Sequence, residues 1–553
     1  MPKARSIRLA LLGVVAAHVA LALAWIGYQE LPQGGRDEFF IVEVATELAY
    51  RLREGAGWSG LRGFISDAYY PPLTRFPGVV ALLAGGGYDS MLVAQWVVWL
   101  PLLVGGTFVV GRKLGGDRAG LIAVAVLLAG PAIADGLHRY EPNLGATAAA
   151  SCVLAAWLYC GHFSDRRASL LFGLFLGLGL MSDRLGVLPF VGLPILWSIV
   201  AVRGRGCWRG LGLAALAVVV TCGWWYADFF GRFAQELIPQ LLGGELGVGG
   251  EVLIEDRTPP LWFWLHYLVL WPDTQLGLVG GLLGLAALVW AAGRVDRPEV
   301  RLALVFLGGG LLLFTLVPKR QAYYTMPLLP AVAALVGAML SELAGRGRVA
   351  LTGVVALVAV ASVPTALNVR PGLVDLNRGM ASWLLLGQSP IQEWLLVQRY
   401  PVGGPPQDLD LDVSALVSTL RSAGLSDDTP IAALSLDSQV SESFLVSLLR
   451  IERHNHRTHG VTRHQEEFVR GIPAAGALVV AHRDGDGWPE SGAIVDVFAN
   501  YYGWDEVYRP VLDRMAALQP LAVQLDQRPL GEEDTLTVWR LGPSPAAAAP
   551  QVE

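Results

Sequence analysis

Ionisable residues in this sequence gather in short groups at the ends of long apolar blocks. Four of these groups are Asp37-Glu38, Arg139 with Glu141, Asp183-Arg184 and Lys319-Arg320. A carboxylate can accept the proton of a hydroxyl group, and a guanidinium or ammonium group can hold a phosphate. If the four groups converge, they can bind a polar headgroup at a membrane surface. Whether they do depends on how the apolar blocks cross the membrane.

The composition is that of a polytopic membrane protein. Of the 553 residues, 53% are hydrophobic and 16% charged, and the mean hydropathy is +0.47. An average soluble chain has about 25% charged residues. The net charge of -6 excludes a basic nucleic-acid-binding protein. Blocks of about 18 apolar residues can cross a bilayer, and we predict about eleven transmembrane helices, at residues 9–28, 89–110, 119–134, 143–161, 168–181, 185–202, 210–227, 274–292, 302–317, 322–341 and 349–367.

The basic residues of the short loops predict the orientation. With the amino terminus inside, the amino-terminal segment and the short inner loops hold sixteen Lys and Arg residues. The short outer connections hold only Arg139, Arg184, Lys319 and Arg320. Because basic loops stay on the cytoplasmic side, we expect residues 29–88, 228–273 and 368–553 to lie outside. The expected location is a bacterial inner membrane.

The expected domains are a transmembrane core at residues 1–367, an extracytoplasmic α/β domain at 368–542 and a disordered tail at 543–553. In the second domain, buried strands are predicted at 431–436 and 477–481, a helix at 441–451 and an alternating strand at 535–541. The first outer loop contains an amphipathic stretch from Phe39 to Leu52, which predicts a helix along the membrane interface.

Three short motifs follow one another in outer loops. They are Arg36-Asp37-Glu38-Phe39-Phe40, Tyr70-Pro71-Pro72-Leu73 and Lys319-Arg320-Gln321-Ala322-Tyr323-Tyr324-Thr325-Met326-Pro327-Leu328-Leu329-Pro330. With the amino-terminal span, this arrangement resembles the membrane glycosyltransferases of the GT-C superfamily. The branch it resembles most is the protein O-mannosyltransferase and lipid A aminoarabinose transferase group. The resemblance covers roughly residues 9–367 and rests on the order of the motifs and their common outward side.

The resemblance implies a GT-C-like helical core and a transferase. The reaction it implies moves one sugar from a polyprenyl-phosphate donor to a hydroxyl acceptor outside the cytoplasm, with inversion. The acceptor would be a lipid, a glycan or a protein, and neither it nor the sugar is identified by the sequence. Membrane lipids surround the enzyme, and no nucleic acid takes part.

By the same resemblance, Asp37 is the general base and Glu38 orients the acceptor or the sugar. Cations must stabilise the departing phosphate, and Tyr324 can hydrogen-bond it. The candidates for the donor phosphate are therefore Lys319, Arg320, Tyr324, Arg139 and Arg184. The candidates for contact with the acceptor or the sugar are Glu141 and Tyr70.

Two registers of the late motif remain open. In the family that the sequence resembles, the basic residue of this motif precedes the tyrosine by a usual spacing. That spacing selects Arg320 if Tyr324 is the matching tyrosine, or Lys319 if Tyr323 is. At the end of the fifth span, relatives often have a basic residue where this sequence has Asp183, so Arg184 takes that role one position later or the role is lost.

No cofactor or metal is expected, because the donor phosphate is already a good leaving group and the outer loops at 29–88 and 228–273 lack an Asp-x-Asp pair. His454, His456, His459 and His464 are close in sequence, but their spacing fits no common zinc motif. The four cysteines lie within or beside apolar blocks and imply no disulfide framework.

Each candidate residue also has a purely structural interpretation. Asp37 can cap a helix that starts at Phe39, Lys319 and Arg320 can extend to the membrane interface, and Arg139 and Glu141 can form an ion pair. The alternative function is a non-enzymatic transporter or flippase of lipid-linked glycans, and a third is a catalytically silent scaffold. The few ionisable groups within the spans disfavour a proton-coupled transporter.

Overall fold

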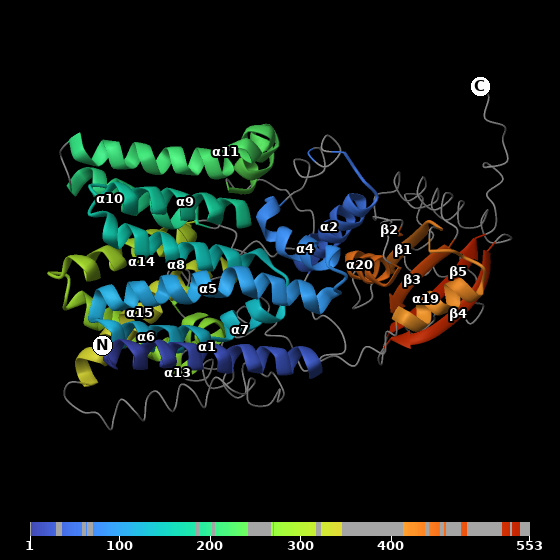
Figure 1. The fold of residues 1–553 in the computed structure, drawn as a ribbon, viewed down its shortest axis with the longest axis horizontal. Helices are drawn as coiled ribbons and strands as arrows, with labels where there is room; N and C mark the ends of the chain where they lie inside the picture. Colours follow the sequence, from blue (N-terminus) through green and yellow to red (C-terminus); the bar gives the residue numbers. More distant parts are fainter. Residues whose placement is uncertain are drawn as a thin grey trace, which may run out of the picture. The chain divides into compact units, whose positions relative to one another are not determined.

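The structure is a computed structural model of the full chain, and it describes a defined set of residues. These are 2–28, 36–57, 62, 70–183, 187–201, 205–241, 267–268, 270–316, 322–344, 413–427, 429–436, 442–453, 458–460, 477–483, 522–530 and 534–541. The chain divides into two compact units (Figure 1). Unit 1 comprises residues 1–29, 62–77 and 92–406, and unit 2 comprises residues 30–61, 78–91 and 407–553.

Helices form unit 1 throughout its described residues. Figure 1 shows long helices side by side with nearly parallel axes. In chain order the helical elements that lie wholly or largely in this unit are α1 (Pro2–Tyr28), η1 (Pro72–Thr74), α5 (Tyr88–Gly115), α6 (Asp117–Leu128), α7 (Pro131–His138), α8 (Pro142–Cys160), α9 (Arg166–Ser182), α10 (Leu188–Ala201), α11 (Arg205–Leu241), η2 (Trp271–Gln275), α13 (Gly277–Ala292), α14 (Pro298–Leu316), η3 (Ala322–Leu328) and α15 (Leu329–Ala344).

Ten of the eleven predicted spans fall on these helices, and the eleventh, at 349–367, lies outside the described residues. Among the described residues, six helices are long and apolar enough to cross a membrane. A seventh span is possible if α6 and α7, which meet at an angle of 63°, form one broken span. The predicted span at 210–227 belongs to the longer helix α11, whose backbone continues to Leu241. The prediction of a polytopic helical membrane protein is therefore confirmed.

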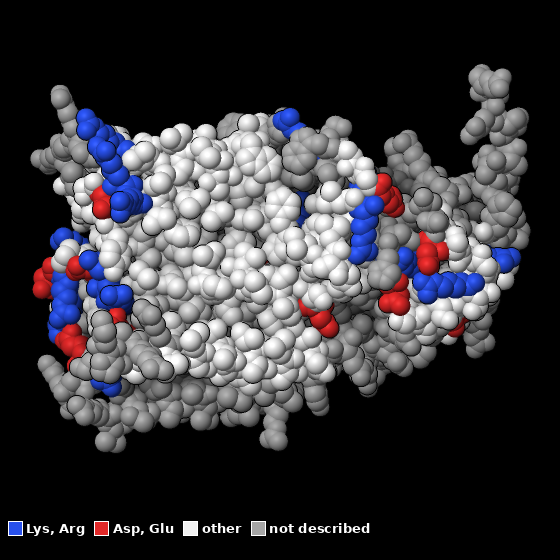
Figure 2. Space-filling view, viewed as in Figure 1, with Lys and Arg blue, Asp and Glu red and all other residues white. Residues whose placement is uncertain are grey.

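Charged side chains gather at the end of unit 1 where α1 begins, and the sides of the helices form a broad uncharged surface (Figure 2). Ion pairs link the loops at this end: Lys113 lies 3.8 Å from Glu299, and Arg294 lies 2.8 Å from Glu342. Charge is costly in hydrocarbon, so its confinement to the helix ends suits a bilayer around the uncharged surface. The side of the membrane that this end faces stays a prediction.

Helix α8 lies at the centre of unit 1, and 94% of its residues are buried. It packs against α9, which in turn packs against α11, while α6 packs against α15. Small residues let these helix backbones approach closely. At Gly337 of α15, a Cβ atom would lie 2.2 Å from the Ala119 carbonyl oxygen of α6.

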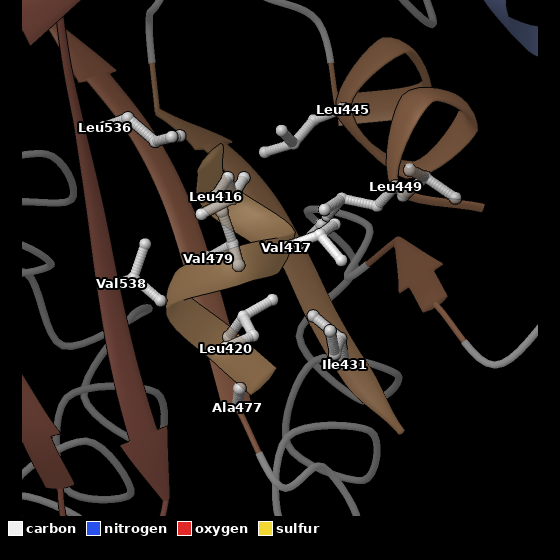
Figure 3. Close-up of a cluster of buried hydrophobic side chains, with 12 residues drawn as sticks. Leu416, Val417, Leu420, Ile431, Leu445, Leu449, Ala477, Val479, Leu536 and Val538 are labelled. Carbon is white, nitrogen blue, oxygen red and sulfur yellow. The ribbon is translucent and has the colours of Figure 1, made fainter. Parts of the chain in front are cut away.

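Unit 2 contains a five-stranded sheet with helices packed on one face. Strands β1 (Ile431–Leu436), β2 (Thr458–Gly460) and β3 (Ala477–Arg483) are parallel, and β5 (Asp534–Leu541) and β4 (Ala522–Leu530) complete the sheet in antiparallel orientation. The order is β2-β1-β3-β5-β4. Residues Leu416 and Val417 of α19 (Val413–Ser422) and Leu445 and Leu449 of α20 (Glu442–Arg453) point into a common core against β1, β3 and β5 (Figure 3).

The α/β elements predicted for the carboxy-terminal segment are confirmed as β1, α20, β3 and β5. Strands β2 and β4 were not predicted. Unit 2 also includes α2 (Arg36–Arg53) and most of α4 (Phe76–Leu83), which come from the first loop. The predicted limits of the domains, at residues 367 and 542, stay predictions.

We expect Gly337→Ala to destabilise the protein, because the new methyl group meets the backbone of α6 and overpacking costs about 1–3 kcal/mol. Thermal unfolding in detergent measures the effect. Gly308→Ala in α14 is the control, since a Cβ atom there meets nothing within 4 Å, and alanine favours a helix over glycine by about 0.5–1 kcal/mol. Equal effects of the two substitutions would contradict the close packing of α15 on α6.

Candidate active site

Prolines break the helices of unit 1 at the two ends of α7. Gly130 has an extended backbone, with φ -71° and ψ 133°, because it precedes Pro131. At the other end, Glu141 is also extended, with φ -123° and ψ 157°, and Pro142 occupies the first position of α8. The linker of residues 139–141 between α7 and α8 is thus a short extended segment. Side chains alternate along such a segment, so Arg139 and Glu141 point to one side and Tyr140 to the other.

Arg139 lies between two carboxylates. Its Nε is 3.0 Å from Asp135 Oδ1, one turn earlier in α7, and its Nη1 is 3.6 Å from Glu141 Oε1. The side chains of Arg139, Asp135 and Glu141 are 6%, 2% and 13% exposed. Asn143 donates a 2.8 Å hydrogen bond to the other oxygen of Glu141. The ion pair considered from the sequence therefore exists, but it is buried and has Asp135 as a third member.

Tyr140 joins this linker to the Tyr-Pro-Pro-Leu motif. Its hydroxyl donates to the carbonyl oxygens of Thr74, at 2.7 Å, and Arg75, at 3.1 Å. The motif forms the 3₁₀ turn η1, which has Pro72 at its first position. Thr74 Oγ1 in turn donates to the carbonyl oxygen of Ser182 at the end of α9. Three segments that are far apart in sequence, the α7–α8 linker, η1 and the end of α9, thus meet in unit 1.

Two further elements hold α7 in place. Gln95 of α5 donates to the carbonyl oxygens of Gly136, at 3.2 Å, and Arg139, at 2.8 Å. On another side, the ring of His138 stacks on Trp25 of α1, with centroids 3.8 Å apart. Helix η3 of the late motif contacts α8, and a Cβ atom on Gly136 would lie 3.8 Å from Met326 of η3. The late motif therefore lies beside the α7–α8 linker.

Arg75 is the residue at this junction that the sequence analysis missed. Its side chain is buried, with the whole residue 1% exposed, and its Nη2 donates to the carbonyl oxygen of Tyr70. Its Nε and Nη1 have no acceptor within the part of the chain that the structure describes. Burial lowers the pKa of Arg75 to about 9, although Tyr140 acts to raise it, so the group is still charged at neutral pH. A buried cation without a carboxylate is costly, and a bound anion removes that cost.

One signal in the sequence could have indicated Arg75. It is the only cation in the apolar stretch from Tyr70 to Leu83, directly after the motif. Charged residues in such surroundings are commonly functional.

The candidate residues of the sequence analysis are divided between the two units. Tyr70, Arg139, Glu141 and Tyr324 lie in unit 1. Tyr324 is half-buried in η3, with its ring centroid 5.4 Å from that of Phe314.

The other candidates are either in unit 2 or outside the described residues. Asp37 and Glu38 lie in the first turn of α2, in unit 2. Helix α2 begins at Arg36, so Asp37 is inside the helix and is not the cap of a helix that starts at Phe39. Arg184, Lys319 and Arg320 lie outside the described residues. The convergence of all four charged groups therefore stays a prediction, as do the roles of the individual residues.

Residues that could bind a metal were also compared with the structure. Over the described ranges, no group of three His, Cys, Asp or Glu side chains is arranged to hold a metal ion. Of the four clustered histidines, His459 lies in β2, and His454, His456 and His464 fall outside those ranges. The four cysteines are buried and are not joined to one another by disulfide bonds.

Comparison with known proteins shows the fold. No family model matches the sequence, and no curated protein gives a significant sequence match. Two crystal structures of ArnT from Cupriavidus metallidurans, one bound to undecaprenyl phosphate and one in the apo state, are similar with a TM-score of 0.58. Their sequence identities are 16% and 17%, and both matches cover 98% of this chain and 99% of ArnT. The arabinofuranosyltransferase AftD from Mycobacteria is similar with a TM-score of 0.50 and 14% identity, over 97% of this chain and 40% of AftD. The predicted GT-C fold is confirmed.

Removing the cation from the buried cluster should be costly. We expect Arg139→Met to lower the free energy of unfolding by about 3–5 kcal/mol, because it removes the guanidinium that contacts the carboxylates of Asp135 and Glu141. The matched control is Arg112→Met. Arg112 pairs with Asp117 at 3.0 Å, but its side chain is 58% exposed, so we expect a loss below about 1 kcal/mol. Similar losses in thermal unfolding would show that the Arg139 cluster is not effectively buried.

Proposed function

We propose that this protein is an inverting membrane glycosyltransferase that uses a polyprenyl-phosphate-linked sugar. The acceptor is a hydroxyl group of a lipid, glycan or protein, and the reaction takes place on the extracytoplasmic face. The observation that carries the proposal is the fold shared with ArnT over 98% of the chain, since one of the ArnT structures holds undecaprenyl phosphate. The buried polar cluster at the α7–α8 linker supports it, because an integral membrane protein buries charge at functional sites.

The proposed reaction is a single displacement at the anomeric carbon. The acceptor oxygen attacks this carbon, its proton passes to the carboxylate of Asp37, and the bond from the carbon to the phosphate oxygen breaks. Polyprenyl phosphate leaves with the bonding electrons. A positioned base typically contributes about 10²- to 10⁴-fold to the rate of such a step, and cations near the phosphate stabilise the charge that develops there. Glu38 would orient the acceptor or the sugar.

Arg75 and Arg139 are both buried in unit 1, and their different contacts indicate different roles. Arg139 already faces the carboxylates of Asp135 and Glu141. We assign Arg139 mainly to holding Glu141, whose partly accessible carboxylate suits a sugar or acceptor hydroxyl. Arg75 has two unused donor atoms among the described residues, so we assign it to the donor phosphate, together with Lys319 or Arg320 and with Tyr324. Tyr70, whose carbonyl accepts from Arg75, lies at the same position. Metal independence remains part of the proposal.

Asp37→Asn tests the general base. We expect it to lower transfer by about 10²- to 10⁴-fold while binding of undecaprenyl phosphate stays unchanged, because the amide cannot accept the proton. Transfer is measured as the release of free polyprenyl phosphate when the purified protein is incubated with membrane lipids and acceptors from cells that lack it. A lipid transporter would keep moving donor lipid across vesicles after this substitution. Continued lipid movement by the Asp37→Asn variant, together with no release of polyprenyl phosphate by the wild type, would favour the transporter.

Arg75→Met tests the anion site. We expect the affinity for undecaprenyl phosphate to fall about 10- to 100-fold, since a hydrogen bond to a charged group contributes about 1.5–3 kcal/mol. The thermal stability of the unliganded protein should not fall, because the substitution removes a buried charge for which the described residues offer no carboxylate partner. Arg75→Lys should retain part of the affinity, and Arg112→Met, at the opposite end of α5, should retain all of it. Unchanged binding by Arg75→Met would refute the assignment.

A further inference from the structure

Helix α2 connects the proposed base to the carboxy-terminal domain. Its first turn carries Asp37 and Glu38, and its later turns belong to the same compact unit as the five-stranded sheet. The helix packs against α20, about 400 positions further along the chain. Ile41, Ala45 and Ala49, which recur every four residues along α2, are fully buried. Helix α2 is therefore an integral, packed element of unit 2.

Arg450 of α20 makes several polar contacts with α2, and the Tyr50 hydroxyl of α2 donates to the carbonyl oxygen of Ile451 at 3.5 Å. Arg450 Nη2 lies 2.7 Å from Glu47 Oε2, and Arg450 Nη1 donates to the carbonyl oxygen of Glu43 at 3.1 Å. The Glu43 carboxylate lies 4.0 Å from the same Nη1. The Arg450 side chain is 5% exposed and that of Glu47 is 10% exposed. The second oxygen of Glu47 accepts from Arg51 Nε at 2.6 Å. The guanidinium thus holds α2 at two successive turns.

Helix α20 can serve as the link because it uses two faces. Leu445, Val446 and Leu449 point into the core shared with α19 and the sheet (Figure 3). Arg450, on the neighbouring face, meets α2. Burial lowers the pKa of Arg450, and Glu47 and Glu43 act to raise it. A buried ion pair of this kind often gives little net stability compared with apolar residues, and its clearest use is to fix one packing geometry.

We infer that Arg450 is a positioning residue for the proposed transfer: by holding Glu47 and the Glu43 carbonyl, it fixes α2 on the carboxy-terminal domain and so sets where Asp37 and Glu38 lie. The inference rests on the proposed function, because it takes Asp37 as the base. Glu47 follows Asp37 by ten residues, which is about 15 Å along a helix. A tilt of about 4° at Glu47 would move Asp37 by about 1 Å, and a displacement of that size can lower a rate about 100-fold. This gives the carboxy-terminal domain a direct role in catalysis.

The test compares an apolar replacement of the pair with a control in the same domain. The double variant Glu47→Met with Arg450→Met keeps a packed interface but removes the directional contacts. We expect its kcat for polyprenyl phosphate release to fall about 10- to 100-fold, with KM for the donor lipid and the affinity for undecaprenyl phosphate unchanged. Hydrogen exchange of the α2 amides should become faster. Arg421→Met is the control: Arg421 pairs with Asp427 at 3.0 Å on the exposed side of α19 and should leave kcat and α2 exchange unchanged.

A conservative substitution separates positioning from folding. Arg450→Lys can still reach Glu47 with its single ammonium group, so we expect kcat between those of the wild type and the double variant. If the double variant does not fold, the Arg450→Lys variant alone provides the test. The inference is wrong if the double variant has the kcat of the wild type. It is also wrong if Arg450→Lys has the kcat of the wild type while its α2 amides exchange faster. If Asp37→Asn itself keeps full activity, the proposed base is wrong, and the exchange measurement alone still decides whether Arg450 anchors α2.

Discussion

The arrangement at the α7–α8 linker depends on the burial of Arg139 between two carboxylates. A guanidinium that is 6% exposed needs its partners within hydrogen-bonding reach, and Asp135 and Glu141 lie on either side of it. Only an extended linker can place Glu141 there, and Pro142 ensures that extension. The same extension directs Tyr140 to the opposite side, where it binds the carbonyls of η1. One electrostatic requirement thus brings distant corners of unit 1 together.

Four arginines are buried among the described residues. One of them, Arg453, donates to the backbone carbonyl oxygens of Ser426, Asp427 and Thr429, and the other three differ in their partners. Arg139 faces Asp135 and Glu141, and Arg450 faces Glu47 and Glu43, so protein carboxylates neutralise both. Arg75 differs, because the described residues offer it only the carbonyl of Tyr70. A fold tolerates such a cation when an anion arrives from outside the chain. This contrast is the reason that we assign Arg75, and not Arg139 or Arg450, to the donor phosphate.

Hydropathy predicted most of the helices because a bilayer imposes long apolar blocks on the sequence. It did not predict the bend between α6 and α7, since Gly130-Pro131 lies within a continuous apolar block. Strands β1 and β3 were predictable as short apolar runs, whereas β4, Ala522–Leu530, is a polar edge strand without that signal. The amphipathic pattern of α2 predicted a helix along the membrane interface and did not indicate that Glu43 and Glu47 contact Arg450. No local pattern can reveal a pairing between residues about 400 positions apart.

The central claim is that this protein consumes a polyprenyl-phosphate-linked sugar. The most direct measurement is mass spectrometry of the membrane lipids of cells with and without the protein. We expect one polyprenyl-phosphate sugar to accumulate in cells that lack the protein, and its acceptor to stay unmodified. The wild-type chain should reverse both changes, whereas the Asp37→Asn chain should reverse neither. An unchanged pool of these lipids, or full reversal by the Asp37→Asn chain, would contradict the central claim.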